Sequence, residues 1–567
     1  MGTSGNRPGF KIFSINTTVR NPNRNEKFLI AFKSFDGKEF TEEVFHSYLA
    51  RLVADGIYRF TRMQEGVRYK LEEGIELTGS EVEQLIRDNP QACGLNGRVM
   101  TQFRALKDQG FLMIEPVRHG LNKISITKLG WDLIGNEEYS TDVYCKAMIG
   151  MHANNPSRPA NYNKARPFLN ALFVIDEVNK LWKALGRDNT GIAKHEFGAF
   201  VLSMKDCDYK KAAEEIIKYR QKYNFRINQK YLENYCYNEL GLIPGKFDNI
   251  TDEYPDDVFR KFEMTGLLTK RGRSTYTMYD FSSYNIEKVK SILVKYKDYS
   301  FKEFRNQTEY YRFLENIHLP WQESLDIRIE IAKRKAAQLG VVIEDYSDII
   351  AVEEYLDNEF YTNVLTQAIE EAEFNSLRKE LMILSGRINS RSMYSDIDEP
   401  LRLEYVLALI LGKSYGKVGL ISNIIYNENG YPLHHAPSRR ADLIYRYLNM
   451  SFIMEPTMLT SPTEMMTRET TGVREHYLTE RARSNDDCMG MVISPFVSSR
   501  VASFFRYYAD DQNENIIPVS IDAFVDMIDK SPRISAFKSQ FDEYLRNLIQ
   551  STPEAYTDVV NSIKPTL

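Results

Sequence analysis

Two apolar runs flank Leu448-Asn449, and each contains one carboxylate where a buried strand normally carries another branched aliphatic residue. The first run, ADLIYRY, includes Asp442, and the second, MSFIMEP, includes Glu455. If Leu448-Asn449 forms a two-residue hairpin loop, residue 447 pairs with 450 and the two acids face each other. Directly opposed residues point to the same side of a sheet, with Cβ atoms about 4.5–5.5 Å apart. Asn suits such a loop, whereas Leu at its first position leaves open a longer loop or a bulge that shifts the register.

Two ionised carboxylates at that separation repel each other. The repulsion is tolerable if one acid holds a proton, if bases neutralise the pair, or if a divalent cation lies between them. Basic side chains are close in the sequence, at Arg439, Arg440 and Arg446. The residues therefore leave two interpretations open: a salt-bridged surface hairpin, or a site where two carboxylates, waters and a substrate phosphate surround Mg²⁺.

Two further acids favour the cation site. Glu404 lies within the apolar run LRLEYVLALILGK, where a lone Glu is rarely buried without a partner. Glu469 opens the helix that we expect over 467–484, after a loop that could return it to the hairpin. His434 and His435 precede the hairpin, and we interpret them as a loop pair because no zinc-site spacing accompanies them.

The length of 567 residues predicts two to four domains. The pattern of expected elements predicts a multidomain α+β protein. Pattern changes divide the chain into two winged-helix-like subdomains over 1–150 and 151–300, a helical linker over 301–395, and an α/β core over 396–567. In this last region we expect a mixed sheet built from a helix at 401–413, the hairpin, the helix at 467–484, a strand at 488–496, and a strand entering a helix at 516–530.

The winged-helix expectation rests on two similar stretches. Residues 95–135 combine a helix that Gly110 would end with two short strands joined by the turn RHGLN, and residues 256–281 repeat this order around the turn KRGRS. The net charge is −5, so any binding of nucleic acid must depend on local basic faces. Candidate DNA contacts are Arg98, Arg104, Lys123 and Arg271, although each by itself also fits an ordinary solvated side chain.

Other features exclude whole classes of protein. The five cysteines are scattered without a CxxC pair, which argues against a structural zinc site and fits a reducing cytosol. The N-terminus lacks the apolar core of a signal peptide, and no run of about 18 apolar residues could cross a membrane. The Gly-rich stretch 411–419 lacks the GxxxxGK[ST] phosphate loop, so an NTP-driven enzyme is not expected.

The segments around the four acids resemble the AlwI family of type IIS restriction endonucleases, which includes site-specific nicking relatives and belongs to the PD-(D/E)XK nuclease superfamily. The matching segments are LRLEYVLALILGK around Glu404, HHAPSRRADLIY around Asp442, FIMEPT around Glu455 and TRETTGVREHY around Glu469. The stretch YRFLENIHLPW (311–321) is also similar to the connector region of the family. The resemblance extends over most of the chain and is firm from about 400 to 480.

The resemblance implies Mg²⁺-dependent hydrolysis of a DNA phosphodiester by a C-terminal PD-(D/E)XK core. Asp442 and Glu455 would hold the metal, Glu469 would take the third acidic position, and Glu404 would add an acid from the first helix. All four would be catalytic residues, and the enzyme would work in the cytoplasm of a bacterial or archaeal cell.

The chain departs from the superfamily pattern at one position. Thr457 stands where the (D/E)XK motif has its Lys. Glu469, a second metal, or a basic neighbour such as Arg468 or Arg474 could cover the role of that Lys.

The resemblance further implies cleavage of double-stranded DNA at a fixed distance outside an asymmetric recognition sequence. One active site per chain cuts one strand, so double-strand cleavage would require a transient homodimer or a partner subunit, and otherwise the product is a nick. A non-catalytic winged-helix DNA-binding protein with a degenerate nuclease domain is the second hypothesis. The presence of all four acids argues against such decay.

Overall fold

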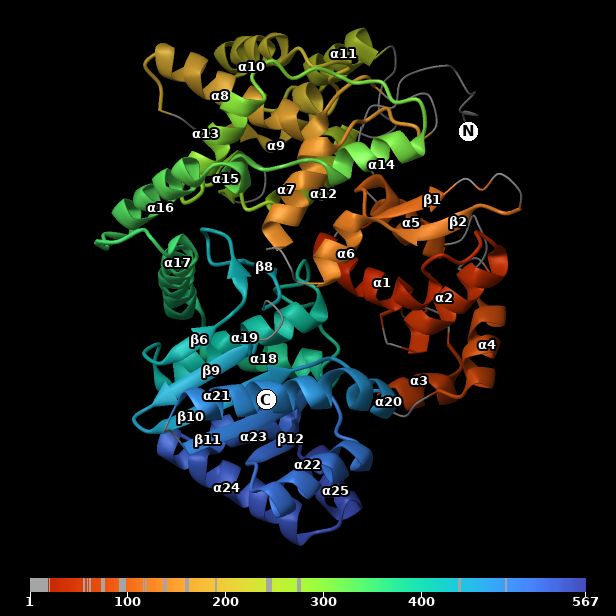
Figure 1. The fold of residues 1–567 in the computed structure, drawn as a ribbon, viewed down its shortest axis with the longest axis vertical. Coiled ribbons are helices and arrows are strands. Elements are labelled where there is room, and N and C mark those ends of the chain that lie inside the picture. Colours follow the sequence, from red (N-terminus) through yellow and green to blue (C-terminus); the bar gives the residue numbers. More distant parts are fainter. Residues whose placement is uncertain are drawn as a thin grey trace. The chain divides into compact units, whose positions relative to one another are not determined.

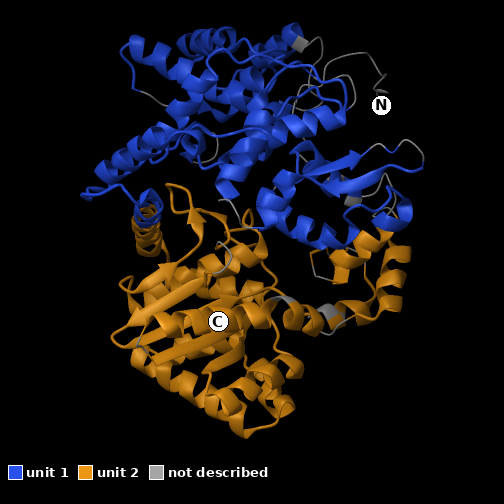
Figure 2. Cartoon of the chain, viewed as in Figure 1, with its two compact units in different colours: residues 1–45, 94–356 blue, residues 46–93, 357–567 orange. Residues whose placement is uncertain are grey.

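The computed structural model describes residues 19–566, apart from residues 20, 55–56, 59, 61–62, 73–76, 91–97, 116, 118–119, 136–139, 159–162, 189–190, 241–246, 273–276, 437–439 and 485–486. The chain forms two compact units (Figures 1 and 2). Unit 1 contains residues 1–45 and 94–356, and unit 2 contains residues 46–93 and 357–567. Residues 46–93 therefore group with the C-terminal part of the chain, and the four-domain division stays a prediction.

Unit 2 is built around a mixed sheet, which for the described residues has five strands in the order β12-β11-β10-β9-β6. The strands are β6 (Leu420–Ser422), β9 (Leu443–Tyr447), β10 (Met450–Pro456), β11 (Asp487–Ser494) and β12 (Ile516–Ser520). β10 is antiparallel to β9 and parallel to β11, which is parallel to β12. β11 is buried at every residue except its first, as expected for a central strand with both faces covered.

Helices cover this sheet. Helix α19 (Glu399–Tyr415) has apolar residues on all sides, begins with a proline at its N-terminus and packs against β10 and β6. Helix α18 (Phe374–Leu384) packs against α19. The helices that follow β10 in the chain are α20 (Pro462–Glu464), the π-helix η7 (Met465–Glu469), α21 (Thr470–Arg483), α22 (Ser499–Gln512), α23 (Ile521–Lys530), α24 (Ile534–Gln550) and α25 (Pro553–Ser562). A small hairpin of β7 (Ile425–Tyr426) and β8 (Pro432–His434) lies beside α19. The α/β character that the sequence predicts is confirmed.

The N-terminal segment of unit 2 contributes the C-terminal half of α2 (Glu42–Ala54), together with α3 (Glu65–Glu72) and α4 (Gly79–Asp88). Helix α4 begins with a capping box, in which Thr78 and Glu81 each satisfy a free backbone N–H of the other. The division between the units falls within α2 and within α17 (Ile349–Glu371), so each of these helices belongs partly to both units.

Unit 1 contains both stretches that the sequence predicts as helix followed by hairpin. In the first, α5 (Arg98–Asp108) precedes the antiparallel strands β1 (Leu112–Glu115) and β2 (Lys123–Ile126), and Gly110 has a φ of +89°. In the second, α12 (Tyr254–Glu263) precedes β4 (Leu268–Arg271) and β5 (Met278–Phe281), and β3 (Ile192–Ala193) pairs with β5.

The remaining elements of unit 1 are mostly helices. Those before β4 are η1 (Pro22–Arg24), α1 (Asn25–Phe32), η2 (Lys33–Phe35), α6 (Lys128–Gly135), α7 (Ser140–Gly150), α8 (Pro167–Ala184), α9 (Lys194–Glu196), η4 (Phe197–Val201), α10 (Tyr209–Tyr223), α11 (Gln229–Leu240) and η5 (Asn249–Glu253). Those after β5 are α13 (Ile286–Lys295), α14 (Gln307–Glu315), α15 (Pro320–Glu323) and α16 (Leu325–Leu339). A search of the described helices finds none with the length and apolar character needed to span a bilayer.

The hairpin of β9 and β10 has the register that the sequence predicts. Met450 pairs with Tyr447, and the ladder continues to the pair of Met454 with Leu443. The next opposed pair is therefore Asp442 and Glu455. Leu448 adopts the left-handed conformation, with a φ of +53°, and its side chain is 84% exposed. The unfavourable first loop residue thus strains the turn without shifting the register.

We expect Leu448→Gly to raise the free energy of unfolding by about 1 kcal/mol. Gly relieves the steric cost of a left-handed residue, which exceeds the entropy that it adds to the unfolded chain. Urea unfolding of the two proteins measures the difference. Asn449→Gly is the matched control, because Asn449 is not in the left-handed region and should gain nothing. A destabilised Leu448→Gly protein would contradict this account of the turn.

Candidate active site

Asp442 and Glu455 lie side by side at the open end of the β9–β10 hairpin. Glu455 is 6% exposed, and its carboxylate accepts a hydrogen bond from the backbone N–H of Asp442. Desolvation, followed by the nearby charges of Glu404, Glu455 and Glu469, raises the pKa of Asp442 well above its usual range. The side chains of Asp442 and Glu455 are within hydrogen-bonding reach of each other. The four acids that the sequence singles out are therefore close together in unit 2.

Glu404 reaches this cluster from the middle of α19. It is 4% exposed, and its Oε1 lies 2.5 Å from Nδ1 of His435, just after β8. Among the described residues, no hydrogen-bond partner satisfies its other oxygen, Oε2, which is also buried. From the sequence, we interpret His435 as one of a pair of loop histidines. In the structure, its partner is the carboxylate of Glu404, within the candidate site.

Glu469 approaches from the next segment of the chain. It is the last residue of the π-helix η7, directly before α21, and it is partly exposed. The expectation of one regular helix over 467–484 is therefore corrected, because its first turn is a π turn. Such turns are rare and often occur at functional sites, where they change the direction of the side chains that follow.

His476 is a member of the cluster that the sequence analysis missed. Its Nδ1 lies 2.8 Å from Oε1 of Glu455, and this hydrogen bond is the main reason that the pKa of His476 is raised. Burial raises the pKa of Glu455, and the contact with His476 opposes that effect. The signal in the sequence was its position seven residues after Glu469, which is two turns along the same helical face.

Other basic residues named from the sequence have different roles. Arg446 pairs with Glu480, with 2.5 Å between Nη2 and Oε1, so it does not fit the salt-bridged hairpin interpretation. Arg474 forms a bidentate pair with Glu514, at 2.7 and 2.8 Å, and stacks on Tyr508. Arg439 and the side chain of Arg468 lie outside the described residues.

Thr457 offers no cation in place of the missing Lys. It is buried, and its backbone N–H donates to the carbonyl of Ile493 at 2.8 Å. Its hydroxyl accepts a hydrogen bond from the backbone N–H of Leu459 at 3.2 Å. Among the described residues, the basic side chain that pairs with Glu455 is His476.

The residues of the cluster suit a hard divalent cation. Within the described chain, no group of three or more His, Cys, Asp or Glu side chains is arranged to hold one metal ion. Mg²⁺, however, usually binds one or two carboxylates and completes its octahedral shell with waters and phosphate oxygens. The opposed pair of Asp442 and Glu455, with a buried oxygen of Glu404 left without a partner, fits that donor set.

The candidate DNA contacts belong to unit 1, whereas the four acids belong to unit 2. Arg104 on α5 and Lys123 at the start of β2 are exposed. Arg271 at the end of β4 is 45% exposed in its side chain and pairs with Asp280 of β5, at 3.1 Å. The side chain of Arg98, like the turn residue Arg118, is outside the described part of the chain. A role in DNA binding stays a prediction for all four candidates.

We expect Asp442→Asn to stabilise the protein in a chelating buffer at neutral pH, by roughly 1–3 kcal/mol, because Asn has no ionised form that burial and the neighbouring acids disfavour. Folding raises the pKa of Asp442. The wild-type protein therefore loses stability as the pH rises through that pKa, and the advantage of the variant should vanish at acidic pH, where Asp442 is protonated.

Thermal unfolding in EDTA across the pH range measures this difference. Asp510→Asn is the control, because Asp510 is an exposed acid of α22 outside the cluster. If Asp442→Asn is no more stable than the wild type at neutral pH, the acids do not repel each other as the structure indicates.

The chain is similar to a known protein family and to solved structures. The sequence of residues 109–527 matches the AlwI restriction endonuclease family. Among solved structures, the small subunit (R.BspD6I2) of the heterodimeric restriction endonuclease R.BspD6I is 15% identical, with a TM-score of 0.27, over 33% of this chain and 97% of its own. Restriction endonuclease FokI is 12% identical, with a TM-score of 0.22, over 94% of this chain and 99% of its own.

Both TM-scores are too low to support an argument about the fold. A search of curated proteins gives no match. The family match, however, spans well over half of the 567 residues, so the chain belongs to the AlwI restriction endonuclease family and is a site-specific deoxyribonuclease.

Proposed function

We propose that the protein is a Mg²⁺-dependent type IIS restriction endonuclease that hydrolyses DNA phosphodiester bonds at a fixed distance outside an asymmetric recognition site. The observation that carries the proposal is the opposed pair of Asp442 and Glu455, with Glu404 and Glu469 beside it. In this proposal unit 2 contains a PD-(D/E)XK nuclease core, and the helix–hairpin stretches of unit 1 are winged-helix-like recognition elements.

Each acid has a separate task. Asp442 and Glu455 would hold the metal ion, whose positive charge would offset the repulsion between two ionised carboxylates. A bound Mg²⁺ would favour the deprotonated form of an attacking water and stabilise negative charge on the scissile phosphate. Glu469 orients the water from the side of α21, and Glu404 holds His435 at the edge of the cluster.

His476 supplies the positive charge that Lys provides in the superfamily motif. Its hydrogen bond at 2.8 Å orients the carboxylate of Glu455, which would be one of the residues that hold the metal ion. The raised pKa of His476 favours the charged form of the ring beside the acids. Because Thr457 is neutral and engaged with the backbone, this charge comes from α21 and not from β10.

The catalytic centre cuts one strand for each chain that binds. Double-strand cleavage therefore requires a second copy of the chain or a partner subunit, and a strand-specific nicking enzyme is the alternative within the same family. The presence of all four acids in one cluster favours an enzyme over a non-catalytic DNA-binding protein.

Supercoiled plasmids of varied sequence, incubated with and without Mg²⁺, test the activity. We expect conversion to linear or nicked DNA only with Mg²⁺. Sequencing the product ends then gives the recognition site, the distance to the cut and the number of strands cleaved. If none of the plasmids is converted, although together they contain a broad set of sequences, the proposal is wrong.

Asp442→Ala tests the site. We expect cleavage to fall by at least the order of 100-fold, because one metal ligand is lost, while DNA binding without metal stays within twofold of the wild type. Gel shifts in EDTA and cleavage in Mg²⁺ measure the two properties. Asp510→Ala, which removes an exposed acid of α22, should change neither. Normal cleavage by Asp442→Ala would show that the metal site is elsewhere.

Variants of His476 test its charge. His476→Ala should lower the cleavage rate by on the order of 10- to 100-fold, as is usual when the hydrogen-bond partner of a metal ligand is removed. His476→Lys should retain more activity than His476→Gln if the positive charge matters. Thr479→Ala, an exposed position of the same helix, is the control. Equal rates for the Lys and Gln variants would assign His476 a purely steric role.

A further inference from the structure

An ion pair connects the N-terminal segment of unit 2 to the turn that carries Glu469. Nη2 of Arg51, in α2, lies 2.8 Å from Oε1 of Glu464, although the two residues are 413 positions apart in the sequence. Glu464 is 8% exposed and is the last residue of α20, directly before η7. The side chain of Arg51 is 36% exposed, whereas Glu464 is buried, so loss of Arg51 would remove a charged partner from a buried carboxylate directly before η7.

The π turn makes the direction of Glu469 sensitive to that anchor. The backbone N–H of Thr470 donates to the carbonyl of Met465, which is the wide hydrogen-bonding pattern of a π-helix. Each residue of an α-helix turns the chain by about 100°. If the wide turn relaxed to α-helical geometry, Glu469 would rotate around the helix axis relative to His476 and the acids of the hairpin.

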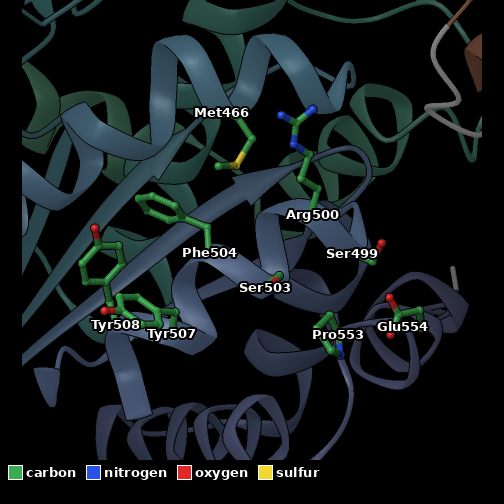
Figure 3. A pocket seen from close by; sticks show the side chains of 9 residues that line it. All are labelled: Met466, Ser499, Arg500, Ser503, Phe504, Tyr507, Tyr508, Pro553 and Glu554. Carbon is green, nitrogen blue, oxygen red and sulfur yellow. The ribbon is translucent and has the colours of Figure 1, made fainter. Parts of the chain in front are cut away.

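One side of η7 is not closely packed. Met466 lines an open pocket of about 570 Å³ together with residues of α22 and α25, among them Arg500, Phe504 and Pro553 (Figure 3). At the start of α20, Nη1 of Arg500 approaches Oγ1 of Thr463 only at the limit of a hydrogen bond, 3.5 Å. On this side η7 contacts α22 and Met465 is buried, but the pocket beside Met466 leaves part of the wide turn without packing, where the Arg51–Glu464 pair adds support.

We propose that Arg51 is a positioning residue of the nuclease, which holds Glu464 so that the π turn directs Glu469 toward Asp442. The inference rests on the proposed function of Glu469. It assigns the N-terminal segment 46–93 a part in catalysis, because this segment supplies a residue that the C-terminal core does not contain. DNA binding is not the role of Arg51.

Arg51→Ala tests the inference in the full-length protein. We expect the single-turnover cleavage rate at saturating DNA to fall roughly 10- to 100-fold, as a displacement of about 1 Å in a catalytic group can cause. The dissociation constant for DNA should stay within twofold. Arg51→Lys should retain most of the rate, and the double variant Arg51→Glu/Glu464→Arg should recover part of what Arg51→Glu loses.

A second measurement does not depend on activity. In the metal-free protein, hydrogen exchange of the peptide that covers 464–472 should be faster in Arg51→Ala than in the wild type, with the rest of unit 2 unchanged. Lys70→Ala is the matched control, because Lys70 forms a similar ion pair with Glu81, at 2.7 Å, within the same segment. It should alter neither the rate nor the exchange of 464–472.

The outcomes separate this inference from the proposed function. A wild-type protein that cuts no DNA would remove the nuclease proposal, while the exchange experiment would still report on the anchor. An active wild type, with an Arg51→Ala variant of unchanged rate and exchange, would overturn the positioning role. Equal losses in Arg51→Ala and Lys70→Ala would also overturn it, because the effect would then be a general one on the segment.

Discussion

The opposition of Asp442 and Glu455 across one hairpin is the constraint on which the rest of the site depends. Two ionised carboxylates about 4 Å apart would repel each other by roughly 4 kcal/mol at an effective dielectric constant of 20. The register of β9 and β10 is set by a buried ladder of apolar pairs, so the acids cannot move apart without displacing core residues to the wrong face. The energy of the core therefore maintains a charge arrangement that is unfavourable by itself.

Surrounding groups partly offset this repulsion. His476 pairs with Glu455, and His435 pairs with Glu404. Each of these two acids therefore has an imidazole partner from a different segment of the chain. No such partner is described for the carboxylate of Asp442, whose pKa is raised first by desolvation and then by the charges of the neighbouring acids. Asp442 is thus the acid of the opposed pair without a described imidazole partner. A cation bound beside it would stabilise the cluster.

The sequence predicted the part of the site that depends on local patterns. A two-residue loop predicted the pairing of Asp442 with Glu455, although Leu448 left a longer loop or a bulge open, and the structure has the predicted register. His476 was missed because its contact with Glu455 depends on where α21 packs against β10, which its spacing from Glu469 does not reveal by itself. The pairing of Arg51 with Glu464 was missed for the same reason, since 413 residues separate the partners. Long-range packing, and not helix or strand propensity, limited the prediction.

In the proposed enzyme, the site would depart from the superfamily motif at Thr457. A Lys at this position would bring a positive charge from the same strand as Glu455, but here the side chain accepts a hydrogen bond from Leu459 and ends the strand. The positive charge of His476 instead comes from α21, which also follows Glu469 directly. The charge and the third acid are then fixed by one helix, so the geometry of its first, π-helical turn matters more than it would if the charge came from β10.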